Sequence, residues 1–142
     1  KFLTTQKGFA ADQIIVFGRS LGGPIAAQLA SRKNPAALIV ESTFTSLPDL
    51  GARLYPLFPV RLLSRFRYHT AEYVRGVACP VLVIHSRSDD IVPYDMGVEV
   101  YRAAVEPKAF LELQGDHNSG FLLTCQAYLA GMKSFIDKHV PD

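Results

Sequence analysis

Four short apolar runs without polar alternation are separated by longer segments with helical spacing. This pattern constrains the fold most, because a strand without polar alternation is typical of burial on both faces of a sheet. The apolar runs are Gln13–Gly18, Ala36–Glu41, Val81–His85 and Ala109–Leu113. The segments with helical spacing are Ser20–Arg32, Tyr94–Ala104 and Ser119–His139. Together they predict an α/β fold with a mostly parallel sheet of about four strands and flanking, right-handed crossover helices.

The interval between the second and third predicted strands, residues 42–79, is too long for a simple crossover. Its centre, Leu50–Tyr68, is rich in Leu, aromatic residues and Arg. Prolines interrupt helix interiors, so we expect three of them to divide this interval into short helices. They are Pro48, Pro56 and Pro59. Two interpretations stay open: residues 46–78 form a small helical lid over the site, or they pack as ordinary surface helices.

The composition of the 142 residues excludes several classes of protein. Apolar residues make up 49% and charged residues 20%, which fits a single globular domain over residues 1–142 and argues against disorder. No apolar run reaches the roughly 18 residues that a membrane-spanning helix needs. The formal charge of +2 is too weak to indicate nucleic acid as a partner.

The two cysteines, Cys79 and Cys125, belong to no CxxC motif and no Cys/His cluster. This arrangement argues against a metal site. We interpret both as buried thiols that serve as small apolar residues, and the sequence leaves a disulfide between them open. The compartment therefore stays open, with a reducing cytoplasm slightly favoured.

The strongest chemical signal is Gly18-Arg19-Ser20-Leu21-Gly22-Gly23, which fits the pattern G-x-S-x-G between a predicted strand and a predicted helix. A sharp strand-to-helix turn would project the Ser20 hydroxyl from the edge of the sheet. We expect Gly18 and Gly22 to be glycines because side chains there would collide across the turn. The backbone N–H of Leu21, at the start of the helix, would face an oxyanion formed on attack by Ser20.

A serine hydroxyl needs a base, and His117 is the best candidate among the four histidines. It lies in a short loop, Gly115–Ser119, after the last predicted strand. The acid should lie between Ser20 and His117 in chain order, and Asp89 follows the third strand at the same predicted edge. Asp90 is its close competitor, and Glu41 at the end of the second strand is a more remote candidate.

With these three residues at three strand ends, the chain resembles the α/β-hydrolase superfamily. The resemblance is carried by IIVFGRSLGG, PVLVIHSRSDDIVP and GDHNS. It implies a serine hydrolase acting on an ester, thioester or amide, with Ser20 as nucleophile, His117 as base, Asp89 as acid and no metal or organic cofactor. The resemblance is strongest to the branch that includes acyl-protein thioesterases and prolyl-oligopeptidase-like relatives.

The chain resembles only the C-terminal half or so of the family fold. Family members begin with further strands and an HG-type loop that supplies a second oxyanion donor, and no such segment precedes Gln13. We therefore expect a truncated hydrolase whose isolated chain has weak or no activity, because losing one donor can cost about 10²–10³ in rate. The strand edge at Gln13–Gly18 would also be unpaired.

Two alternatives follow from the residues. An inactive fragment would serve as an interaction module and form a homodimer through the strand edge at Gln13–Gly18. Association with a membrane surface is suggested by Tyr55–Arg67, which mixes apolar, aromatic and Arg residues, although a lid has the same composition. The expected substrate is a small molecule or an acyl group. Four apolar residues suit either an acyl chain or ordinary packing: Phe44, Leu50, Leu54 and Phe58.

Overall fold

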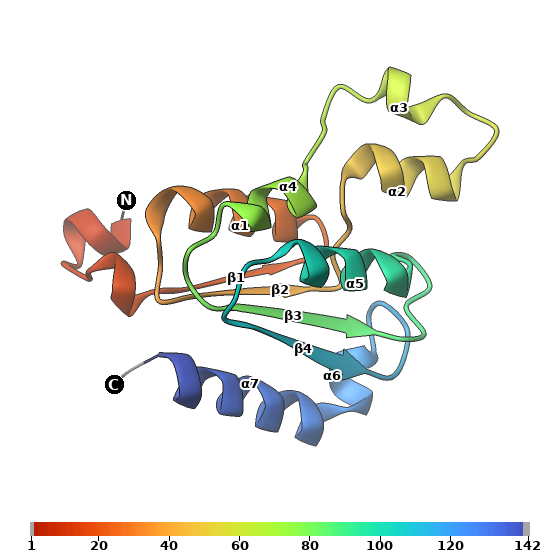
Figure 1. The fold of residues 1–142 in the computed structure, drawn as a ribbon. Coiled ribbons are helices and arrows are strands. Elements are labelled where there is room, and N and C mark those ends of the chain that lie inside the picture. Colours follow the sequence, from red (N-terminus) through yellow and green to blue (C-terminus); the bar gives the residue numbers. More distant parts are fainter. Residues whose placement is uncertain (1, 141–142) are drawn as a thin grey trace.

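Four parallel strands form a single sheet, in the order β1-β2-β3-β4, in a computed structural model that describes residues 2–140 (Figure 1). The strands are β1 (Ile15–Arg19), β2 (Ala37–Glu41), β3 (Val81–Ser86) and β4 (Lys108–Leu113). Spatial order equals chain order, so each crossover connects neighbouring strands. The prediction of a parallel, four-stranded α/β fold is therefore confirmed, with strand ends within two residues of those expected.

Helices cover both faces of this sheet (Figure 1). One face carries α1 (Gly22–Lys33), α4 (Thr70–Arg75) and α5 (Tyr94–Ala103), and the other carries α7 (Cys125–His139). Successive strand residues point to opposite faces, so two cores result. Leu38, Val40 and Val83 pack with the first group of helices, whereas Ile39, Leu82 and Ile84 pack in a cluster with Phe135 of α7.

The segment between β2 and β3 contains two short helices before α4. They are α2 (Leu47–Leu54) and α3 (Val60–Leu63), and they stand away from the sheet in Figure 1. Pro48 was expected to interrupt a helix, but it lies in the first turn of α2, where a helix has no hydrogen-bond acceptor for the N–H that proline lacks. Pro56 and Pro59 separate α2 from α3. Because α4 packs on α1 and α5, it belongs to the layer that covers the sheet, and a lid formed by residues 46–78 stays a prediction.

Three local expectations were wrong. β1 is not buried on both faces: it is an edge strand, and Phe17 is 46% exposed. The helical pattern over Ser119–His139 is divided into α6 (Gly120–Leu123) and α7, because the backbone of Thr124 departs from helical geometry and its hydroxyl donates to the Gly120 carbonyl. Cys125 is exposed rather than buried, whereas Cys79 is buried as expected, and both thiols are free.

Replacing Ile84 by Ala is expected to lower the free energy of unfolding by about 2–5 kcal/mol, because it leaves a cavity on a fully buried central strand. The matched control is Ile25→Ala on α1, where the side chain is 56% exposed and the expected change is within about 0.5 kcal/mol. Urea denaturation followed by circular dichroism measures both variants. Equal losses would contradict the central position of β3.

Candidate active site

The turn between β1 and α1 holds Ser20 in a conformation that few side chains adopt. Its φ of 51° lies in the left-handed region, which costs a non-glycine residue on the order of 1 kcal/mol or more. The backbone is held by β2 and the loop after it: the Ser20 N–H donates to the Glu41 carbonyl at 2.8 Å, and the Thr43 hydroxyl donates to the Ser20 carbonyl at 2.9 Å. The turn therefore presents Ser20 at the carboxyl edge of the sheet.

The glycines of this turn differ from the expectation at one position. A Cβ on Gly18 would overlap the Gly22 carbonyl and the Ala26 side chain, so the close approach predicted for Gly18 is present. A Cβ on Gly22 would meet no atom within 4 Å, so the expected collision there was wrong. The tight position is Gly23 instead, where a Cβ would overlap the side chain of Thr43.

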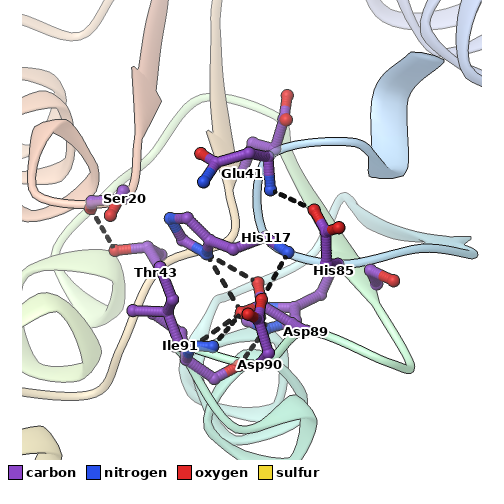
Figure 2. A network of polar contacts seen from close by, with 12 residues as sticks. Ser20, Glu41, Thr43, His85, Asp89, Asp90, Ile91 and His117 are labelled. Atoms are coloured by element: carbon purple, nitrogen blue, oxygen red, sulfur yellow. Dashed lines mark hydrogen bonds and ion pairs between the residues drawn. The ribbon is translucent and has the colours of Figure 1, made fainter.

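Asp89 and His117 lie in contact, although 28 positions separate them in the chain. The two carboxylate oxygens of Asp89 are 2.9 and 3.0 Å from His117 Nδ1 (Figure 2). Asp89 Oδ1 also accepts the N–H groups of Ile91 and Val92, which fixes the carboxylate in its loop. With its proton on Nδ1, facing the carboxylate, the imidazole has a free acceptor at Nε2. Figure 2 shows that edge of the ring turned toward Ser20.

The two competing acids, Asp90 and Glu41, contact groups other than the imidazole. Asp90 Oδ1 accepts the backbone N–H of His117 at 2.9 Å, so it holds the peptide of the histidine and not its ring. Glu41 is buried and contacts Arg19 and Tyr128, with the Tyr128 hydroxyl 2.8 Å from Oε2. Neither carboxylate contacts the imidazole, which leaves Asp89 as the ring partner within residues 2–140.

Near this site lie two features that sequence reasoning missed. His85 is fully buried at the end of β3, with Nε2 2.9 Å from the Val92 carbonyl and 3.6 Å from Asp89 Oδ2. Burial lowers the pKa of His85, so its ring is neutral near neutral pH. Arg19, next to the serine, donates from its guanidinium to the His117 carbonyl. The available signal in the sequence was that both are polar residues close to a motif. Their partners could not be predicted, because these contacts depend on tertiary packing.

The start of α1 offers a candidate donor for an oxyanion. The N–H of Leu21 has no backbone acceptor within the described part of the chain and stands at the start of α1. Among residues 2–140, no group of three or more His, Cys, Asp or Glu side chains is arranged to hold a metal ion. That the chemistry needs no metal or organic cofactor stays a prediction.

The apolar candidates for an acyl-chain surface separate into two groups. Phe44 and Leu50 are buried in a small cluster with Val92 and Met96, so they serve packing. Leu54 and Phe58 are exposed. An open hollow of about 600 Å³ between α2 and α3 includes Phe58 in its lining, together with Leu47, Gly51, Tyr55, Val60 and Ser64.

No family model matches the chain, but individual proteins do. An uncharacterised protein of Mycobacterium tuberculosis H37Rv is 39% identical over 96% of this chain and 49% of its own length. The α/β hydrolase domain-containing protein aho-3 of Caenorhabditis elegans is 32% identical over 96% of this chain and 40% of its own length. The α/β hydrolase domain-containing protein WAV2 of Arabidopsis thaliana is 31% identical over 92% of this chain and 49% of its own length. The chain thus spans about half the length of the curated relatives it matches.

Solved structures show the same fold. The esterase domain of a Rhodothermus marinus protein is 25% identical, with a TM-score of 0.71 over 99% of this chain and 65% of that domain. The Pyrococcus furiosus esterase Pf2001 is 17% identical, with a TM-score of 0.79 over 99% of this chain and 59% of its own. At that identity the second likeness concerns the fold alone.

We expect Gly18→Ala to lower the free energy of unfolding by about 1–3 kcal/mol, because the added methyl group overlaps the backbone of the turn. Gly22→Ala is the matched control: the new methyl group meets open space, and the expected effect is neutral or stabilising by about 0.5–1 kcal/mol at the start of a helix. Thermal unfolding of the two variants measures the difference. A Gly22→Ala variant as unstable as Gly18→Ala would show that this turn is described wrongly.

Proposed function

We propose that this chain, which has the fold of α/β hydrolases and resembles α/β hydrolase domain-containing proteins over nearly all of its length, carries the catalytic residues of a serine hydrolase acting on an ester, thioester or amide. The observation that carries the proposal is the pairing of a strained serine turn with the His117–Asp89 contact of 2.9 Å at the same sheet edge. Esterase and α/β-hydrolase relatives support the hydrolase class, while the roles of Ser20, His117 and Asp89 belong to the proposal.

In the proposed mechanism, His117 Nε2 removes the hydroxyl proton of Ser20 as Oγ attacks the substrate carbonyl carbon. The negative charge that develops on the carbonyl oxygen is stabilised by the N–H of Leu21 and by a second donor. The tetrahedral intermediate then collapses. Its bond to the leaving group breaks, and His117 delivers the proton to that group, which leaves an acyl ester on Ser20.

Water completes the cycle by the same steps. His117 removes a proton from a water molecule, whose oxygen attacks the acyl carbon, and the proton is returned to Ser20 Oγ as the acid product leaves. Asp89 orients the imidazole and stabilises the imidazolium without taking its proton. Its two backbone donors, the N–H groups of Ile91 and Val92, keep the carboxylate in place during this change of charge.

One observation supports the alternative, which is an inactive chain that serves as an interaction module. β1 pairs with β2 on one side, and its other side carries no strand within residues 2–140. A homodimer through this edge is the corresponding proposal. It requires a concentration-dependent dimer, measured by analytical ultracentrifugation, together with an absence of reaction at Ser20.

A second proposal concerns the surface of α2 and α3. The stretch Leu50–Ala71 contains four arginines and neither Asp nor Glu, although two of these arginines, Arg53 and Arg61, pair with Asp95 and Asp49. Large apolar side chains on this segment face outward, with Leu57 93% and Leu62 86% exposed. A lid that buried its apolar face over the site would show the opposite pattern, whereas a segment at an anionic lipid surface combines exposed apolar and cationic side chains. No helix in the described part of the chain is long and apolar enough to cross a bilayer.

A fluorophosphonate probe is expected to label the full-length protein at Ser20, and Ser20→Ala should abolish this labelling. Asp89→Asn should slow it by about 10³–10⁴ because the imidazole loses its orienting anion. Asp90→Asn should have a much smaller effect, since an amide oxygen can still accept the His117 N–H. Ser31→Ala on α1 is the control serine. Mass spectrometry of the labelled peptide locates the adduct, and labelling that survives Ser20→Ala removes the assignment.

The lipid proposal predicts co-sedimentation with phosphatidylcholine vesicles that contain phosphatidylserine, and much weaker binding without the anionic lipid. Leu57→Asp should abolish binding. Arg65→Gln should weaken it about fivefold, the equivalent of about 1 kcal/mol per arginine at the surface. Leu129→Asp, on the exposed face of α7, is the matched control and should leave binding unchanged. Binding lost equally in Leu57→Asp and Leu129→Asp, or unaffected by vesicle charge, would contradict the proposal.

A further inference from the structure

Arg19 precedes Ser20 directly, and its guanidinium joins three other parts of the chain. Nε lies 3.2 Å from Glu41 Oε1 at the end of β2, and Nη2 donates to the carbonyl oxygen of His117. The same guanidinium lies over the ring of Phe121 on α6, 5.9 Å from its centroid. The residue beside the proposed nucleophile is thus in contact with the loop that carries the proposed base.

Glu41 makes this arrangement rigid. Glu41 is only 2% exposed, and a buried carboxylate needs compensating partners. Arg19 supplies one partner and the Tyr128 hydroxyl on α7 supplies the other, at 2.8 Å from Oε2. Burial and the neighbouring carboxylate raise the pKa of Tyr128, so the phenol stays protonated and donates. The charge of Glu41 therefore fixes the direction of the guanidinium.

The backbone of His117 is held at both of its polar groups. Its N–H donates to Asp90 Oδ1 at 2.9 Å, and its carbonyl accepts from Arg19. Asp89 holds the ring at Nδ1. With these groups occupied, the one polar atom of His117 left for chemistry is Nε2.

We propose that Arg19 is a positioning residue that couples the serine turn to the histidine loop, oriented by Glu41 and Tyr128. The inference rests on the proposed roles of Ser20 and His117. This role requires arginine in particular, because one planar guanidinium donates to a carboxylate through Nε and to a carbonyl in another direction through Nη2. An ammonium group is a single point charge. Tyr128 acts one step further away, through the carboxylate of Glu41.

The test compares Arg19→Gln, Arg19→Lys and Tyr128→Phe in the full-length protein. With a p-nitrophenyl ester as the probe substrate, we expect Arg19→Gln to lower kcat about 10- to 100-fold with KM nearly unchanged, because a displaced base slows the chemical step without removing substrate contacts. Arg19→Lys should recover part of this loss, and Tyr128→Phe should show a smaller loss. Lys133→Gln breaks an exposed ion pair on the same helix as Tyr128 and is the matched control, with no expected change.

A second measurement is independent of activity. Hydrogen–deuterium exchange of residues 115–120 should become faster in Arg19→Gln than in the unmodified protein and in Lys133→Gln, because the loop loses its link to the serine turn. Unchanged exchange in this loop would overturn the inference whatever the kinetics show. An equal loss of activity in Arg19→Gln and Arg19→Lys that follows a general loss of stability would also overturn it. Failure of the proposed function shows separately, as probe labelling that survives Ser20→Ala.

Discussion

The parallel register of β1, β2 and β3 is the constraint on which the rest of the site depends. Arg19 lies beside Glu41 in the ladder between β1 and β2, and Glu41 lies beside Ile84 in the next ladder. Parallel strands end at one edge, so the residues that follow them meet there. The hydrogen bond from the Ser20 N–H to the Glu41 carbonyl extends this ladder by one residue into the turn, and the left-handed serine is thereby tied to the sheet.

Much of this arrangement could be predicted from the sequence because it follows from local patterns. Continuous apolar runs indicated all four strands, and their alternation with helices indicated the parallel order. Asp89 and His117 follow strands that end at the shared edge, so topology predicts that their loops meet, with Asp90 as the competing acid. The prediction was less accurate where burial depends on neighbours: β1 has a strand-like sequence, but as an edge strand it leaves Phe17 half exposed.

The remaining features depend on packing between distant segments. The contact of Glu41 with Tyr128 joins residues 87 positions apart and depends on how α7 lies across the sheet, which no local pattern specifies. The close approach expected at Gly22 lies at Gly23 for a similar reason, since Thr43 from the loop after β2 approaches the second of these glycines and not the first. The three carboxylates near His117 look alike in sequence, yet one binds the ring, one the backbone N–H and one the arginine.

The second histidine explains why the Asp89 charge remains available to His117. His85 lies 3.6 Å from Asp89 Oδ2, close enough that an imidazolium there would neutralise the carboxylate. Burial lowers the pKa of His85, and its Nε2 proton is directed to the Val92 carbonyl at 2.9 Å. A neutral His85 therefore shapes the loop that carries Asp89 without competing for its charge. The negative charge of Asp89 is then free to stabilise the imidazolium that forms on His117 in the proposed reaction.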